Sequence, residues 1–230
     1  MCGITGFLWP PGHPQIQDAP AHVQAMMRAI SHRGPDSQGH WVDQEAGIAL
    51  GHLRLAIVDL SPAGHQPMVS STGRYQLVYN GEIYNYRALR AELENAGKAP
   101  EWRGTSDTEV MLRGFEVWGF EETIRRIQGM FAIALWDHEE SKLLLARDRL
   151  GEKPLYYGWQ GTGKGAIFLF GSELKALRAQ PAFRAEVRRD ALVAMLRHGH
   201  VPEDLTIYEG LMKLRPGEMA EVSLTAPGPG

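Results

Sequence analysis

The chain opens with Met1-Cys2-Gly3-Ile4-Thr5-Gly6, which places its one cysteine at position 2, directly before a strand-like segment. We expect a strand over 3–9, because Pro10-Pro11-Gly12 ends the apolar stretch. A lone cysteine is most often a small buried hydrophobic residue. At position 2, removal of the initiator Met would instead give Cys2 a free α-amino group, with an unperturbed pKa of about 7.7–8.0. Because such an amine can act as a general base on the adjacent thiol, Cys2 is a candidate nucleophile.

Length and composition exclude several classes of protein. The 230 residues fit one large domain, or one domain plus a tail. No apolar run approaches the roughly 18 residues of a membrane helix. A net charge of -3 gives no sign of the basic surface that nucleic-acid binding requires. We therefore expect neither a membrane nor a nucleic acid as partner. A single cysteine and no evident signal peptide favour a reducing compartment, so we expect the protein in the cytoplasm.

The order of the expected elements indicates an α+β fold. Helices are expected at 22–30, 86–95, 106–118, 173–178 and 190–198. Further strands are expected at 41–42, 48–50, 55–58, 75–80, 130–136, 143–147, 155–159, 167–170 and 218–224. Strands outnumber helices and fall into two groups, which favours mostly antiparallel pairing over a regular βαβ array.

Five motifs follow Cys2 along the chain. They are His32-Arg33-Gly34-Pro35-Asp36, His52-Leu53-Arg54-Leu55-Ala56-Ile57-Val58-Asp59, Tyr79-Asn80-Gly81-Glu82-Ile83-Tyr84-Asn85, Thr105-Ser106-Asp107-Thr108-Glu109 and Arg147-Asp148-Arg149-Leu150-Gly151-Glu152-Lys153-Pro154-Leu155-Tyr156-Tyr157. With Cys2 they resemble the glutaminase domain of glutamine-dependent asparagine synthetases, in the class II (N-terminal nucleophile) glutamine amidotransferase family. The Arg-Gly-Pro-Asp segment favours the asparagine synthetase branch. The resemblance implies a four-layer αββα sandwich, with two mostly antiparallel sheets between helices.

The resemblance also implies hydrolysis of glutamine to glutamate and ammonia through a thioester at Cys2. The α-amine of Cys2 would be the base, and Asn80 and Gly81 would form the oxyanion hole. Taken alone, Asn80-Gly81 is typical of a type I′ hairpin turn and would favour that structure, but the flanking Tyr79 and Glu82-Ile83-Tyr84-Asn85 decide against it. No histidine is required, so we expect His32 and His52 to be structural.

Substrate binding is assigned by the same resemblance. Arg54 would hold the α-carboxylate of glutamine, since its planar fork makes two parallel hydrogen bonds to a carboxylate. Glu82 and Asp107 would hold the α-ammonium, although Asp107 also suits the first turn of a helix that Ser106 caps, and Glu82 could act through its backbone. Ile57 would complete the substrate site. A loop of Arg33, Gly34 and Asp36 would support it.

Domain organisation follows from where the resemblance ends. We expect a glutaminase domain over 1–180, with 181–230 as a lead-in or linker to a C-terminal synthetase domain, in cis or in trans. The sequence has no Ser-Gly-Gly-x-Asp-Ser loop, so ATP and Mg are expected only on that absent domain. This chain needs no cofactor, shows no metal-ligand spacing, and is compatible with a homodimer.

Two other functions stay open from the sequence. The glutaminase could feed another acceptor, such as a sugar, a β-lactam or a modified peptide. The chain could also be a non-catalytic glutamine-binding module, if Met1 is retained and the Cys2 nitrogen is an amide that cannot serve as a base.

Overall fold

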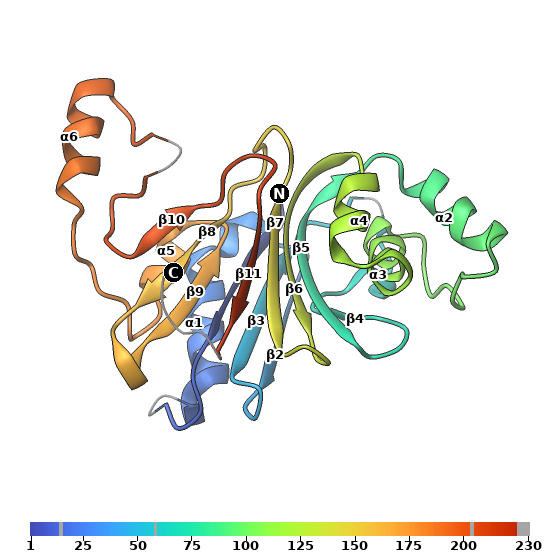
Figure 1. Ribbon diagram of the computed structural model, residues 1–230, viewed down its shortest axis with the longest axis horizontal. Coiled ribbons are helices and arrows are strands. Elements are labelled where there is room, and N and C mark those ends of the chain that lie inside the picture. Colours follow the sequence, from blue (N-terminus) through green and yellow to red (C-terminus); the bar gives the residue numbers. More distant parts are fainter. Residues whose placement is uncertain (14–15, 58, 203–204, 225–230) are drawn as a thin grey trace.

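Two antiparallel sheets lie face to face between two groups of helices (Figure 1). The computed structural model describes residues 1–13, 16–57, 59–202 and 205–224. The six-stranded sheet has the order β10-β8-β9-β1-β3-β2, and the five-stranded sheet has the order β11-β7-β6-β5-β4. All strand pairs in the described part of the chain are antiparallel, as the sequence predicts.

The strands are short, apart from the two central ones of the second sheet. The first sheet contains β1 (Gly3–Leu8), β2 (Ser37–Asp43), β3 (Ile48–Arg54), β8 (Tyr156–Gln160), β9 (Ile167–Gly171) and β10 (Leu211–Lys213). The second contains β4 (Met68–Val69), β5 (Tyr75–Ile83), β6 (Gly129–Asp137), β7 (Lys142–Arg147) and β11 (Met219–Ser223). The helices are α1 (Ala19–Ala29), α2 (Tyr86–Asn95), α3 (Asp107–Trp118), α4 (Phe120–Arg126), α5 (Leu174–Arg178) and α6 (Arg189–His198).

Three hydrophobic cores separate the layers. The middle core joins the two sheets, where Leu8 and Leu50 of the first sheet meet Val78 and Trp136 of the second. On the outer face of the first sheet, apolar residues pack with α1 and α5. On the outer face of the second sheet, they pack with α2, α3 and α4. The four layers are therefore helix, sheet, sheet and helix, which confirms the predicted αββα sandwich.

One predicted strand is wrong. Residues 55–57 of the expected strand 55–58 form no strand, and Val58 lies outside the described residues. Instead β3 continues past the predicted 48–50 as far as Arg54, and the chain then turns away. The reason is a contact with another segment of the chain: the backbone N–H of Ala56 donates to the Asp36 carboxylate at 2.8 Å, so it has no strand partner.

Short elements escaped prediction because they carry too little periodic sequence. The strands β4 and β10 have two and three residues, and α4 has seven. Gly119, with φ +81°, separates α3 from α4. The sequence predicted the end of the first helix at Trp118 but no second helix after it.

The segment 181–230, expected as a lead-in, contributes to both sheets. Within it, β10 pairs with β8 at an edge of the first sheet, and β11 pairs with β7 at an edge of the second. Helix α6 lies apart from the sheets at the periphery (Figure 1). Along the described chain, no helix has both the length and the apolar character to cross a membrane.

Candidate functional site

A cavity of about 250 Å³ gathers residues from distant parts of the chain. It lies where the start of β1, the end of β3, strand β5 and the first turn of α3 converge. Seven of the residues that the sequence analysis proposes for chemistry or substrate binding line it together: Cys2, Arg54, Ile57, Asn80, Gly81, Glu82 and Asp107. A cavity of this size suits a small ligand rather than a drug-sized one.

The Cys2 thiol is partly buried at the entrance to β1. The backbone N–H of Leu55 donates to Sγ at 3.3 Å, and Sγ lies 3.5 Å from the Leu55 carbonyl oxygen. Burial raises the pKa of the Cys2 thiol, against the opposing effect of the Leu55 hydrogen bond. A thiol with a raised pKa is protonated at neutral pH, so nucleophilic chemistry here needs a base that takes its proton.

Asn80 and Gly81 lie inside β5, paired with Ala132 and Phe131 of β6. The hairpin-turn alternative for Asn80-Gly81 is therefore wrong. Asn80 is 1% exposed, and its Nδ2 has no hydrogen-bond partner among the described residues. A buried amide donor normally finds a partner, because leaving it unpaired costs roughly 1–3 kcal/mol. Its place in the cavity wall marks it as a donor for a bound acceptor.

Glycine is required at position 81 by the neighbouring strand. A Cβ there would lie 2.2 Å from the Met130 carbonyl oxygen and 2.8 Å from the Phe131 Cα. Both are backbone atoms of β6, which cannot move aside without breaking the sheet pairing. The bare backbone of Gly81 therefore forms a wall of the cavity.

The guanidinium of Arg54 is fixed by backbone oxygens of the loop that follows β3. It donates from Nη1 to the Ser61 carbonyl at 2.9 Å and from Nη2 to the Asp59 carbonyl. Gly64 packs directly against the guanidinium, where a Cβ would lie 2.2 Å from Nη2. Arg54 is thus part of the cavity wall and not a free surface arginine.

Asp59 ties this loop to the segment before α3. Its carboxylate accepts from the backbone N–H of Ser61 at 2.8 Å and from that of Thr105 at 3.0 Å. The pKa of Asp59 is lowered, first by hydrogen bonding from the Ser61 side chain and then by these bonds from the backbone of Thr105 and Ser61. The contact holds the Arg54 side of the cavity against the Asp107 side.

Asp107 is buried in the first turn of α3, and Ser106 is the N-cap as predicted, accepting from the backbone N–H of Glu109 at 3.4 Å. The Asp107 carboxylate is not free, because its Oδ2 accepts from the Tyr79 hydroxyl and from the Ile83 N–H, both at 2.9 Å. Burial raises the pKa of Asp107. Glu82, also in the cavity wall, makes no side-chain hydrogen bond or ion pair with the residues that the structure describes.

Comparison with known proteins decides the family. A model of the family described as "Glutamine amidotransferase domain" matches residues 1–226. The chain belongs to this glutamine amidotransferase domain family. The match confirms the family that the motifs predict.

Curated relatives carry the amidotransferase domain within longer chains. "Asparagine synthetase [glutamine-hydrolyzing] 3" of Bacillus subtilis (strain 168) is 39% identical over 219 residues, covering 94% of this chain and 34% of that protein. "Amidase chry2" of Gibberella zeae is 34% identical over 227 residues, covering 94% of this chain and 32% of that protein. The chain therefore spans about a third of the length of these relatives.

A solved structure described as the allosteric regulatory enzyme of purine biosynthesis has the same fold. It superposes with a TM-score of 0.67 at 21% identity, and the alignment covers 96% of this chain and 47% of that one. This likeness confirms the α+β fold class.

Arg33, Gly34 and Asp36 do not line the cavity of the amidotransferase domain. Arg33 is buried and donates from Nε to the Cys2 carbonyl at 3.0 Å, while its Nη1 pairs with Glu173 at 2.7 Å. Gly34 touches the β3 backbone so closely that a Cβ would lie 2.3 Å from the Leu53 carbonyl carbon. These contacts hold the backbone of Cys2 and, through Asp36, the loop after β3.

The two histidines of the motifs lie outside the cavity lining. His52 is buried, with Nε2 3.1 Å from the Tyr79 carbonyl oxygen, and burial lowers its pKa to about 3. His32 contacts Glu173 at 2.9 Å. Within the described residues, no group of three or more His, Cys, Asp or Glu side chains is arranged to hold a metal ion.

Sequence reasoning missed several residues of the cavity wall, namely Met1, Leu55, Asp59, Gly64, Gln66, Tyr79, Ser106, Thr108, Met130 and Lys153. Asp59, Tyr79 and Lys153 lie within the motifs quoted above, so the motifs could have pointed to them, but no role was assigned to these residues. Gln66 had no such signal, yet its Oε1 accepts from the Tyr79 N–H at 2.7 Å.

Proposed function

We propose that this amidotransferase domain hydrolyses glutamine to glutamate and ammonia through a γ-glutamyl thioester on Cys2. The observation that carries the proposal is the Asn80 amide, a buried donor that has no partner in the described part of the chain and lines the same small cavity as the Cys2 thiol. A nucleophile and a donor for a developing oxyanion are the two groups that acyl transfer requires.

The reaction begins with a proton transfer. The free α-amine of Cys2, after removal of Met1, takes the thiol proton directly or through a water molecule. The thiolate attacks the side-chain amide carbon of glutamine, and the negative oxygen of the tetrahedral intermediate accepts from Asn80 Nδ2 and from the Gly81 backbone. The C–N bond then breaks as the amine returns the proton to the leaving nitrogen, which releases ammonia. Water hydrolyses the thioester to glutamate and regenerates Cys2.

Glutamine is held through its charged end. Arg54 receives the α-carboxylate, because its guanidinium is fixed in the cavity wall and its fork matches a carboxylate. Glu82 and Asp107 receive the α-ammonium. The Glu82 carboxylate has no partner among the residues with described positions, and the Asp107 carboxylate is oriented by Tyr79. Ile57, 68% exposed at the rim of the cavity, covers the methylene groups of the substrate.

The ammonia serves a second reaction elsewhere. Relatives named as glutamine-hydrolysing asparagine synthetases support an acceptor derived from aspartate, activated by ATP and Mg on a synthetase domain in cis or in trans. This chain itself needs no cofactor, and a homodimer is compatible with the proposal. The cytoplasm is the proposed location, because the single cysteine forms no internal disulfide. The relative named as an amidase favours a second candidate, delivery to a different acceptor.

The test is glutamate release from glutamine by the wild-type chain and by Cys2→Ala. We expect the variant to fold, as judged by circular dichroism, and to release no glutamate above background. Equal release by both proteins would end the assignment of Cys2 as the nucleophile. An intact mass that shows Met1 retained in active protein would refute the amine as base, and glutamine binding without release by the wild type would favour the binding-module alternative.

A further inference from the structure

The motif over 147–157 has no role in the glutaminase proposal, yet it is organised around two buried charges. Arg147 donates to three carbonyl oxygens, those of Lys153 at 2.8 Å, Leu214 at 2.7 Å and Gly151 at 2.5 Å. Asp148, 1% exposed, accepts from the backbone N–H of Lys153 at 3.0 Å and from that of Phe131 in β6 at 3.2 Å. Both peptide groups of Lys153 are thereby fixed to the second sheet.

This scaffold presents the side chain of Lys153 to the cavity. Lys153 is 7% exposed and lines the cavity with Cys2, Asn80 and Gly81. Its Nζ lies 3.5 Å from the Sδ of Met1, the residue that precedes Cys2. A thioether is a weak acceptor, so this contact does little to offset burial of the charge.

No carboxylate pairs with Lys153 among the residues that the structure describes. Buried lysines are almost always paired, because an unpaired buried ammonium is costly. An ammonium held without an anion in the wall of a reaction cavity indicates a role in the chemistry of that cavity.

We infer that Lys153 is a positioning residue for the glutaminase reaction, whose ammonium keeps the neighbouring α-amine of Cys2 in its neutral, proton-accepting form. The inference rests on the proposed function. Once Met1 is removed, the amine belongs to Cys2 and shares the cavity with Lys153. A like charge disfavours protonation of the amine, and only the neutral amine can take the thiol proton.

Other charged and titratable groups near the α-amine of Cys2 also affect its protonation. They are the Cys2 thiol, Arg54, Asp59, Tyr79, Glu82 and Asp107 in the cavity wall, together with Arg33, which does not line the cavity but donates from Nε to the Cys2 carbonyl at 3.0 Å. The carboxylates of Glu82 and Asp107 favour the protonated amine. Arg54 and Arg33 act in the same sense as Lys153. Backbone carbonyls bind the guanidinium of Arg54, and Arg33 pairs with Glu173 at 2.7 Å. Lys153 differs from both arginines because its ammonium has no carboxylate or carbonyl partner among the described residues, and its charge adds to theirs against the carboxylates of Glu82 and Asp107.

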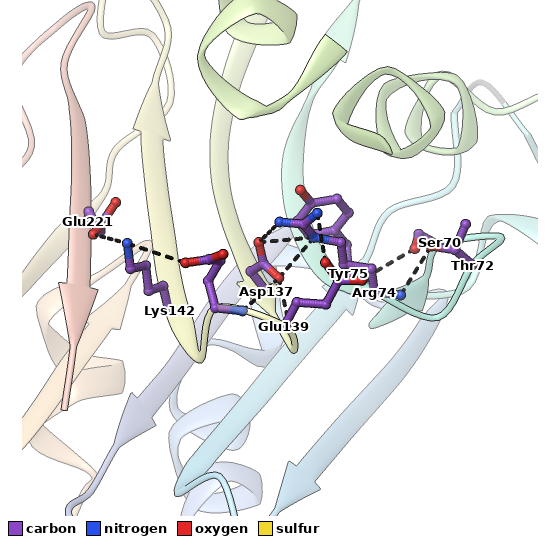
Figure 2. Close-up of polar contacts among 9 residues, drawn as sticks. Ser70, Thr72, Arg74, Tyr75, Asp137, Glu139, Lys142 and Glu221 are labelled. Carbon is purple, nitrogen blue, oxygen red and sulfur yellow. Dashed lines mark hydrogen bonds and ion pairs between the residues drawn. The ribbon is translucent and has the colours of Figure 1, made fainter. Parts of the chain in front are cut away.

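The experiment measures kcat and KM for glutamine hydrolysis from pH 5.5 to 9.5 in the full chain, comparing wild type with Lys153→Met and Lys153→Arg. Lys142→Met is the matched control, since Lys142 pairs with Glu221 at 2.8 Å and lies outside the cavity lining (Figure 2). A unit charge several ångströms away, at an effective dielectric constant of 20–80, moves an amine titration by about 0.5–1.5 pH units.

We expect the acid limb of kcat/KM to move to higher pH by that amount in Lys153→Met, which lowers kcat/KM about 3–30-fold on the acid side and leaves the alkaline plateau unchanged. Lys153→Arg and Lys142→Met should keep the wild-type limb. A Lys153→Met enzyme with an unmoved limb, or with only a raised KM, would overturn the inference. Loss of activity in Lys153→Met that Lys153→Arg does not restore would also overturn it. No glutamate release by wild type at any pH would instead overturn the proposed function.

Discussion

Replacing Asn80 with Ala should separate catalysis from stability in this domain. The side chain is 1% exposed, and its Nδ2 has no partner among the described residues. If the amide stabilises the oxyanion, its loss lowers kcat by about 10²–10³-fold, equivalent to about 2.7–4 kcal/mol of transition-state stabilisation. KM should change little, because this donor acts on charge that develops only in the transition state.

The same substitution should cost little folding free energy. An unpaired buried amide carries a desolvation penalty of roughly 1–3 kcal/mol, and its removal offsets the packing that is lost with the side chain. We expect the free energy of unfolding to change by less than about 1 kcal/mol, so that Tm moves by less than about 4 °C. A catalytic defect without a stability defect is the signature of a donor kept for the reaction.

Asn85→Ala provides the matched control. Its amide is satisfied, donating to the Arg126 carbonyl at 3.0 Å and accepting from the Gln128 N–H at 2.9 Å, and it lies outside the cavity lining. Losing two hydrogen bonds should cost about 1–3 kcal/mol, which lowers Tm by about 2–12 °C with kcat unchanged. The assay is glutamate release with thermal unfolding of the same samples. A kcat for Asn80→Ala within threefold of wild type would refute the oxyanion role.

Two further predictions concern substrate binding and stability. Arg54→Ala should raise the KM for glutamine about 10–150-fold, since a hydrogen bond to a charged group is worth roughly 1.5–3 kcal/mol; steady-state kinetics with an unchanged KM would contradict its role. Burial opposes ionisation of Glu116, but hydrogen bonds from Ser71, Thr72 and Arg113 prevail and lower its pKa to about 2, so its charged form stabilises the fold. That contribution is complete above the unfolded pKa of 4.5 and is lost as the pH falls to about 2. Glu116→Gln should therefore destabilise the protein by at most about 3 kcal/mol at pH 7, with a difference in unfolding free energy that shrinks between pH 4.5 and 2; a gap that stays constant over this range would disprove the linkage.

Local sequence signals determined most of the architecture. Apolar periodicity and turn residues located the main strands and helices, and Ser106 identified the start of α3, because capping depends on a few adjacent residues. The position of Cys2 and the order of five motifs indicated the family. Elements of two or three residues, β4 and β10, carry no periodic signal and were missed.

The candidate site was likewise predicted only in part. Residue types such as Arg54 and Asp107 could be proposed from their motifs, because their chemistry matches the two charged groups of glutamine. That Asp107 is already bonded to Tyr79 and Ile83 could not be foreseen, since these contacts form only when α3 packs on β5.

The sequence by itself thus determined the fold class, the family and the kinds of side chain available for chemistry, because each rests on neighbouring residues or on motif order. Only the tertiary structure decided that the chain leaves the strand after Arg54, that the buried Asn80 amide has no partner among the described residues, and that Lys153 contacts the Met1 side chain. These facts depend on contacts between segments far apart in the chain, which strand pairing and core packing bring together and which no local pattern encodes.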